Sequence, residues 1–193
     1  MSMEHKAFIF DFNAFLKLEK EIINAVKKSD TKPVYDFINK NLDECVSPYS
    51  EEELDENWQD ELESEDLKEL CDFALTCCYD ITDDQGLSNI WEALLNIMKQ
   101  LEWSFAAEYY ILGNGVSYGD FDLDPGGMGT GFVEKNDIEK MNSDLIKNRG
   151  KFIEKLKTVN KMENKNDLEE GYEVLLSLYS DALNEKKGLL FTF

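Results

Sequence analysis

The sequence predicts a mostly helical α+β fold with a small sheet of about three short strands. Apolar residues recur at helical spacing over most of the 193 residues, and only three short, strongly apolar runs are typical of strands. Hydrophobic residues make up 42% of the chain and aromatic residues 12%, which is enough to bury a core. Because no internal repeat or flexible linker interrupts the pattern, we expect one domain over residues 1–193.

The N-terminal part begins with a predicted strand and two predicted helices. Lys6–Phe12 is short and rich in Phe and Ile, as is typical of a strand. The helical spacing of apolar residues then predicts a helix over Asn13–Lys28. Pro33 suits the first turn of a second helix, which we expect to end near Asn41.

A polar stretch follows, and the sequence leaves its structure open. Ser50 and Glu53 fit a capping box, which favours a helix start. Leu54–Glu63 is so polar that a short exposed helix and an ordered loop are both compatible with it. Apolar residues then return on one helical face over Ser64–Tyr79 and again over Leu87–Leu101, which predicts two amphipathic helices.

The segment after these helices contains a predicted strand followed by a glycine-rich stretch. Phe105–Leu112 is rich in aromatic residues and is the second predicted strand. Residues 113–131 contain seven of the eleven glycines, and we expect them to form a long structured loop.

The C-terminal third is predicted to be helical apart from its last residues. Asn136–Lys147 and Lys151–Lys161 suggest one interrupted helix or two, broken at Gly150. Asp167–Leu183 is the last long predicted helix. The apolar end Gly188–Phe193 is predicted to be a strand that pairs in the sheet, because it would otherwise be exposed.

The four cysteines indicate reduced thiols in a cytoplasmic protein. They are Cys45, Cys71, Cys77 and Cys78. The adjacent pair makes an ordinary disulfide framework awkward, and the absence of Cys-x-x-Cys spacing disfavours zinc. Helical periodicity places Cys71 and Cys78 on a core face. We expect no signal peptide and no membrane span.

Negative charge is concentrated in the middle of the chain. Between Asp43 and Glu134 there are 24 acidic and two basic residues, a net charge of −22, whereas the rest carries 17 acids and 18 bases. Clustered carboxylates repel one another, so this concentration is a candidate docking surface for a basic partner. The alternative is a solvated surface that keeps the protein soluble and monomeric.

Part of the chain resembles a known family. Gly86–Leu94 is similar to the "Leu-x-Lys-x-Trp-Asp-x-Leu-His" helix of the YfbM-like family of uncharacterised bacterial proteins. Ile111-Leu112-Gly113 resembles the family's "Ile-Leu-Gly" strand end. The helix from Tyr172 to Asn184, which runs into Gly188–Phe191, resembles the family's closing helix and strand. Leu95 stands where the family often has His, and the acidic stretch 43–72 has no counterpart. The resemblance implies a small soluble α+β domain and supplies no activity.

The glycine-rich segment contains a candidate calcium site. Asp120, Asp122 and Asp124 alternate like the first three ligands of an EF-hand loop, and Ca²⁺ accepts six to eight oxygen ligands. The match then fails, because Pro125 occupies the glycine position and Gly131 the glutamate position. Apart from this possible Ca²⁺, we expect no cofactor.

Catalytic and nucleic-acid-binding patterns are weak. The one histidine, His5, is expected in a mobile N-terminus, so no Ser-His-Asp or Cys-His arrangement can be assigned. Arg149 is the one arginine among 20 basic residues, although Arg is the usual means of gripping phosphate or carboxylate. The basic stretch Lys135–Lys165 contains few aromatic residues, so we expect no direct nucleic-acid binding.

The leading hypothesis is a non-catalytic protein-binding domain. A bacterial immunity or inhibitor protein whose acidic face occludes a basic protein partner is its most concrete form. Trp58 is either an aromatic anchor in that face or a core residue. The expected partner-binding residues are Glu52, Glu53, Asp55, Glu56, Trp58, Asp60 and Glu61. The alternative is a small ligand- or Ca²⁺-binding domain, or a hydrolase, with its site in residues 113–131.

Overall fold

The fold is α+β and mostly helical, as the sequence predicts. A computed structural model describes residues 3–124, 127, 129–158 and 165–193. The elements in chain order are β1 (Lys6–Phe10), α1 (Phe12–Lys28), α2 (Lys32–Lys40), the 3₁₀ helix η1 (Trp58–Glu61), α3 (Leu67–Leu75), the 3₁₀ helix η2 (Thr76–Cys78), α4 (Trp91–Met98), α5 (Tyr109–Leu112), β2 (Val116–Tyr118), β3 (Phe121–Leu123), β4 (Thr130–Val133), α6 (Lys135–Thr158), α7 (Lys165–Glu185) and β5 (Gly188–Thr192).

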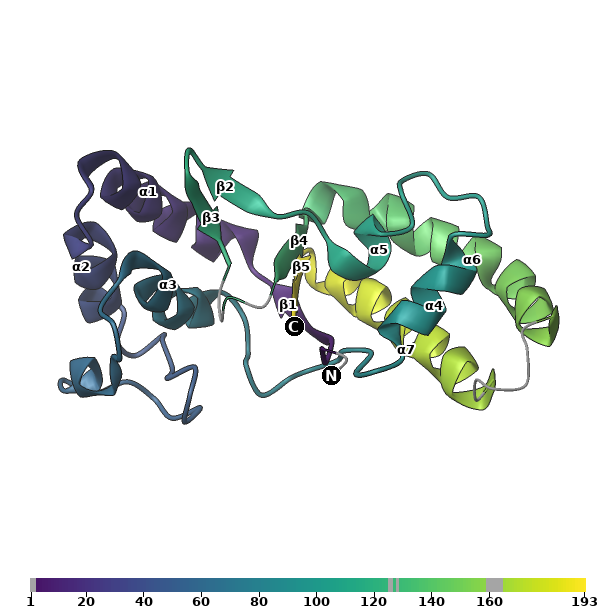
Figure 1. Ribbon diagram of the computed structural model, residues 1–193, viewed down its shortest axis with the longest axis horizontal. Coiled ribbons are helices and arrows are strands. Elements are labelled where there is room, and N and C mark those ends of the chain that lie inside the picture. The colour runs from purple at the N-terminus through teal and green to yellow at the C-terminus, as the bar shows by residue number, and fades with distance from the viewer. Residues whose placement is uncertain (1–2, 125–126, 128, 159–164) are drawn as a thin grey trace.

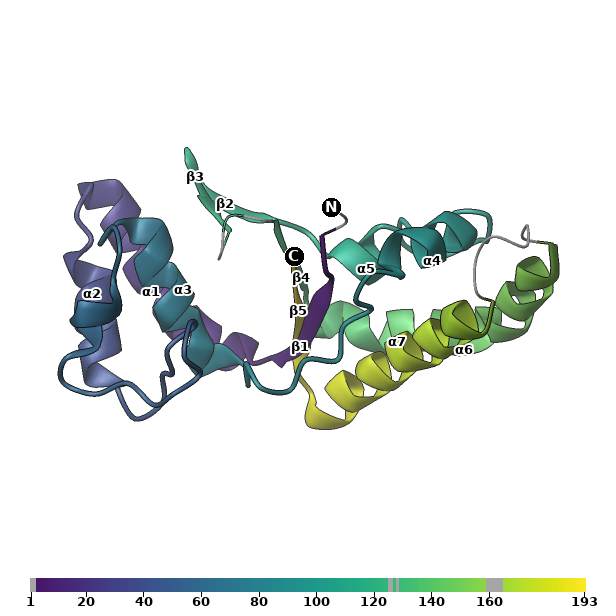
Figure 2. The same cartoon turned by 60° about the horizontal axis from the view of Figure 1, so that its bottom comes forward.

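The centre of the molecule is a three-stranded antiparallel sheet in the order β1-β5-β4. The C-terminal strand β5 is therefore the middle strand, with Lys6 opposite Thr192 on one side and Thr130 opposite Thr192 on the other. Helices cover both faces, with α1–α3 on one side and α4–α7 on the other (Figures 1 and 2). Two buried faces explain why the strands are almost continuously apolar instead of alternating with polar residues.

Side chains alternate along the strands between two hydrophobic cores. One core contains α4–α7 and receives Ala7, Val133, Leu189 and Phe191 from the sheet. The other contains α1–α3 and receives Phe8, Phe10, Phe132 and Leu190. Because neighbouring residues of a strand point to opposite faces, the same short strands supply both cores.

The N-terminal elements confirm the sequence predictions closely. The carboxylate of Asp11 accepts the backbone N–H groups of Asn13 and Ala14 and so caps α1, which ends β1 at Phe10 instead of Phe12. Pro33 lies in the first turn of α2, as expected. The helix predicted from Ser64 begins at Leu67, because the Asp66 side chain caps α3 through the Glu69 N–H.

The predicted strand Phe105–Leu112 is wrong. The segment turns and then forms the short helix α5. Tyr109, Tyr110 and Ile111 are consecutive and all buried, whereas a strand would bury only every second side chain on one face. The phenol groups also need polar partners inside the core: Tyr110 donates to Asp144 at 2.8 Å, and Tyr109 donates to Asp137 at 2.8 Å.

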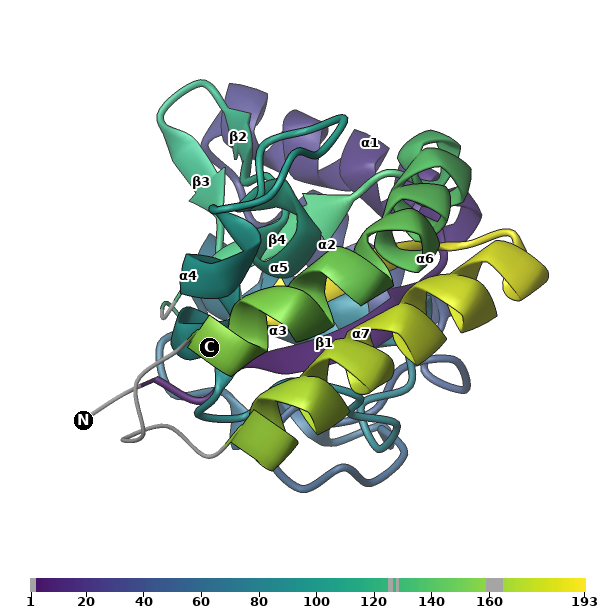
Figure 3. The same ribbon diagram turned by 90° about the vertical axis from the view of Figure 1, so that its right-hand side faces the viewer.

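The predicted break at Gly150 is also wrong. α6 continues through Gly150, which is exposed and has no neighbouring atom within 4 Å of an added Cβ. A glycine in a helix costs about 1 kcal/mol relative to alanine. α6 and α7 pack side by side along their lengths in front of the sheet (Figure 3), and this packing outweighs that cost. The predicted extension from residue 159 to Lys161 lies outside the described residues.

The glycine-rich segment contains strands at positions where we expected only a loop. β2 and β3 form an antiparallel hairpin, and Thr130 begins β4. Gly131 is required here, because an added Cβ would lie 1.7 Å from the Leu112 carbonyl oxygen. Asn114 and Phe132 exchange backbone hydrogen bonds of 2.9 and 2.8 Å beside it, so the glycines allow two backbones to approach closely.

Candidate functional site

The strongest local feature is residues 43–66, which form most of the connection between α2 and α3 and are called the acidic loop below. It contains twelve Asp and Glu residues and no Lys or Arg. The capping box predicted at Ser50 and Glu53 does not start a helix, and the only helical turn in the loop is η1. The acidic loop lies on the α1–α3 side of the sheet, away from α4–α7 (Figure 2).

Six of the seven predicted partner-binding side chains are exposed on this loop. They are Glu52, Glu53, Asp55, Glu56, Asp60 and Glu61. Among the residues that the structure describes, none of these six forms an ion pair with a lysine or arginine. Two accept local hydrogen bonds, Asp55 from the Asn57 N–H at 2.6 Å and Glu61 from the Ser47 hydroxyl at 2.5 Å. The loop therefore presents a uniformly negative surface with no internal counter-charge.

Trp58 is not part of that surface. Only 1% of the residue is exposed, and its ring packs against Tyr35 and Phe73 with centroid distances of 5.2 and 5.5 Å. The indole N–H donates to Asn39 at 3.1 Å. The anchor interpretation of Trp58 is therefore wrong, because burying this large apolar ring in the α1–α3 core stabilises the protein more than exposing it would. Its role is to hold the middle of the acidic loop against α2 and α3.

Glu69 fixes the end of the acidic loop. Its carboxylate accepts the backbone N–H groups of Glu63 (2.6 Å), Ser64 (2.7 Å) and Glu65 (2.9 Å), together with the Ser64 hydroxyl at 2.9 Å. Burial tends to raise the pKa of Glu69, but these hydrogen bonds to the charged form outweigh it and lower the pKa to about 2. Sequence analysis missed this residue, because nothing local marks a helical glutamate as the acceptor for a preceding loop.

Ser47 fixes the beginning of the loop in a similar way. Its hydroxyl oxygen accepts the N–H groups of Tyr49 and Ser50 at 3.2 and 3.1 Å, and its own N–H donates to the Glu52 carbonyl at 2.8 Å. Glu51 has a left-handed φ of 61°, which is uncommon for a residue other than glycine. The exposed carboxylates are thus carried by a backbone that is ordered at both ends.

Tyr49 is the exposed aromatic residue of this region. It is 57% exposed, and its hydroxyl donates to Glu69 at 3.2 Å. Burial of the hydroxyl and the nearby Glu69 raise the pKa of Tyr49 to about 12, so it stays a neutral donor. It also lines a pocket of about 250 Å³ together with Asp72 and Tyr79. The signal that could have identified it is the Ser-Pro-Tyr break at the start of the acidic loop.

The structure does not gather the three predicted calcium ligands into a metal site. Asp120 lies in the β2–β3 turn, Asp122 accepts the Ser117 hydroxyl at 2.7 Å, and Asp124 accepts the Gly129 N–H at 2.9 Å. Within the described ranges, no three His, Cys, Asp or Glu side chains are placed to hold a metal ion. Pro125, which the EF-hand comparison used, lies outside those ranges.

His5 is a structural residue and does not lie in a mobile terminus. It is 1% exposed, its Nε2 lies 2.7 Å from the Ile111 carbonyl oxygen, and its Nδ1 accepts the Leu87 N–H at 3.1 Å. Burial lowers the pKa of His5 below its usual value, so the neutral ring with a proton on Nε2 fits these contacts. The prediction of a mobile N-terminus at His5 was wrong, because His5 directly precedes β1 and its backbone pairs with that of Ser88.

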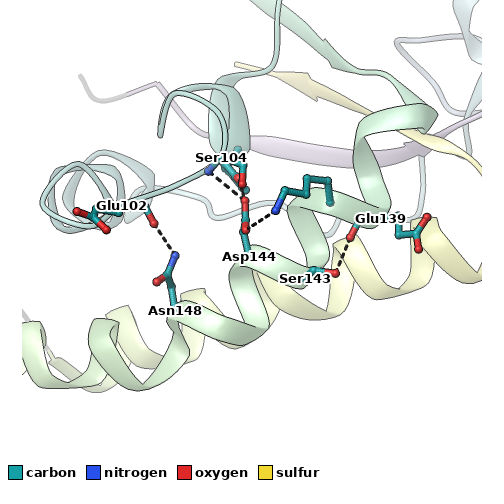
Figure 4. Close-up of polar contacts among 8 residues, drawn as sticks. Glu102, Ser104, Glu139, Ser143, Asp144 and Asn148 are labelled. Atoms are coloured by element: carbon teal, nitrogen blue, oxygen red, sulfur yellow. Dashed lines mark hydrogen bonds and ion pairs between the residues drawn. The ribbon is translucent and has the colours of Figure 1, made fainter.

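A cluster of buried polar side chains, centred on Asp144 and Asn148, lies on α6 (Figure 4). Asp144 is 5% exposed and accepts the Ser104 N–H at 3.1 Å. It also accepts the Tyr110 hydroxyl at 2.8 Å. The Asn148 side chain donates to the Glu102 carbonyl at 2.8 Å. These bonds tie the connection between α4 and α5 to α6. Because its bonds join buried groups of neighbouring elements, we assign the cluster a structural role.

Comparison with known proteins identified no relative of this chain. No family model, no curated protein and no solved structure matches the chain. The resemblance to the YfbM-like family therefore stays a prediction. In the part of the chain that the structure describes, no helix has both the length and the apolar character needed to cross a lipid bilayer.

Proposed function

We propose that this protein binds a basic protein partner through the acidic loop, and that it acts as an inhibitor or immunity protein by covering the partner's functional surface. The observation that carries the proposal is a set of exposed carboxylates that form no ion pair with any described lysine or arginine and are held on an ordered backbone. Unpaired carboxylates repel one another, and a cationic surface would relieve that repulsion. An ordered loop loses little conformational entropy on binding.

Charge would act mainly on the rate of association and on the choice of partner. Concentrated charge of one sign steers an oppositely charged protein and raises its association rate by 10- to 1,000-fold, an effect that salt screens. Tyr49 is the candidate anchor within this charged surface, since exposed tyrosines are enriched at interface hot spots. The neighbouring pocket of about 250 Å³ is lined by both Lys6 and Asp72 together with aromatic side chains, so it suits an apolar side chain of the partner.

The test is a pull-down from host lysate with three versions of the tagged protein at low and high salt. One version is the natural sequence, and the second carries Glu52→Lys, Glu56→Lys and Asp60→Lys. These three side chains are exposed and accept no hydrogen bond in the described structure, so folding should be retained. The matched control carries Glu102→Lys, Glu139→Lys and Glu170→Lys, three exposed acids on the α4–α7 side.

The expected result depends on position as well as charge. A basic protein should be retained at low salt by the natural sequence and by the control, and lost with the acidic-loop variant and at high salt. Both variants change the net charge equally, so equal loss from both would show a nonspecific charge effect. If both variants retained the basic protein equally, the acidic loop would not be part of the interface.

A further inference from the structure

Three of the four cysteines meet beside a pocket that the proposed function does not use. The pocket has a volume of about 440 Å³ and lies where η2 approaches β1 and the end of α7. Cys77 and Cys78 both line it. Cys77 is partly exposed, whereas Cys78 is 3% and Cys45 1% exposed. Cys77 is therefore the thiol that a molecule in the pocket can reach.

The sulfur atoms of Cys77 and Cys78 are in contact. Their Sγ atoms are 3.7 Å apart, and the Sγ atom of Cys77 also lies 3.0 Å from the Ala74 carbonyl oxygen. Hydrogen bonds from Cys45 and Cys78 lower the pKa of Cys77, whereas the same contacts and burial raise the pKa of the two donors. The thiolate, which is the reactive form of cysteine, is thus favoured on the accessible residue of the three.

Cys45 is the better disulfide partner for Cys77. A bond between Cys77 and Cys78 would close a strained ring across one peptide unit, far from ordinary disulfide geometry. Cys45 comes from a different segment, and that segment is held against η2 because the Val46 N–H donates to the Thr76 hydroxyl at 3.0 Å. All four cysteines are free thiols, so the pair is available for oxidation.

We propose that Cys77 is a peroxide-reactive thiol that forms a reversible disulfide with Cys45. The Cys77 thiolate attacks one oxygen of hydrogen peroxide, the O–O bond breaks, and the products are a sulfenic acid and hydroxide. The Cys45 sulfur then attacks the sulfenic sulfur, the S–S bond forms, and water leaves with the Cys45 proton. One peroxide oxidises two thiols and yields two water molecules, and a dithiol reductant reverses the change.

The charges around the pocket select for a small neutral oxidant. The lining includes one lysine, Lys187, against five carboxylates, which come from Asp11, Glu44, Asp80, Asp83 and Glu185. Anionic disulfides such as oxidised glutathione are repelled by this lining, whereas uncharged hydrogen peroxide is not. The disulfide would also close a covalent loop around most of the acidic loop, from Cys45 to Cys77.

The first experiment uses the reduced full-length protein, hydrogen peroxide, rapid blocking of free thiols and tryptic mass spectrometry. Cleavage after Lys40, Lys68 and Lys99 puts Cys45 in peptide 41–68 and the other three cysteines in peptide 69–99. The expected product is a cross-link between these two peptides that dithiothreitol removes. An oxidised bridge confined to peptide 69–99, or the absence of any disulfide, would overturn the proposal.

Cysteine variants identify the sulfur atoms. Cys77→Ser and Cys45→Ser should each abolish the cross-link, whereas Cys78→Ser and the control Cys71→Ser should retain it. A cross-link that persists in Cys77→Ser contradicts the assignment. As a measurement that needs no variant, brief treatment of the natural protein with iodoacetamide should label Cys77 at least ten times faster than Cys71, which is 1% exposed. Equal labelling rates would contradict the proposal.

Discussion

Replacing Glu69 with Gln tests whether one buried carboxylate organises the acidic loop. The substitution keeps the shape of the side chain but turns one oxygen into an NH₂ donor. Each oxygen of Glu69 accepts at least one backbone N–H, from Glu63 on one side and from Ser64 and Glu65 on the other. Whichever way the amide turns, at least one backbone N–H faces another donor.

The expected loss follows from the proton affinity of the carboxyl group. The pKa of Glu69 falls from 4.5 to about 2 in the folded protein. At about 1.4 kcal/mol per tenfold change in affinity, the charged form stabilises the fold by about 3 kcal/mol at pH 7. Because the pKa is lowered on folding, this contribution is complete above pH 4.5 and is lost as the pH falls through about 2.

Urea unfolding of the natural protein and of Glu69→Gln at two pH values is the assay. The difference in unfolding free energy should be about 3 kcal/mol at pH 7 and about 1.4 kcal/mol at pH 3. Glu63→Gln, an exposed neighbour with the same change in charge, is the matched control and should lose less than about 0.5 kcal/mol. A loss below about 1 kcal/mol for Glu69→Gln, or an equal loss at both pH values, would refute the reasoning.

Three further predictions concern other parts of the molecule. Because burial lowers the pKa of His5, stability should fall as the pH drops below 6.5, and His5→Gln should reduce that dependence when urea midpoints are compared at pH 7.5 and 5.5. Gly131→Ala should lower the thermal midpoint by 5 °C or more, since the new Cβ would lie 1.7 Å from the Leu112 carbonyl oxygen. The control Gly150→Ala, in open space on α6, should leave the thermal midpoint unchanged or raise it. Millimolar Ca²⁺ should leave the thermal midpoint unchanged, and a rise that Asp122→Asn abolishes would show that the loop carboxylates gather around the ion.

The sequence by itself determined the features that depend on residues close to one another along the chain. Helical periodicity and local caps predicted α1, α2 and α7, and the strongly apolar ends predicted β1 and β5. The position of the negative charge is also a property of sequence alone. Six exposed carboxylates of the acidic loop could be named without a structure, because charged side chains without a partner remain in water.

The tertiary structure decided which of two locally plausible arrangements each remaining segment adopts. Tyr109–Leu112 forms a helical turn because three consecutive side chains find space in one core, and Gly150 stays helical because α7 packs along α6. Trp58 turns inward because α2 and α3 offer an apolar site and an acceptor for its N–H. Such outcomes depend on contacts between residues that are distant in the sequence, and the energy of those contacts exceeds the small local preferences that a sequence pattern reveals.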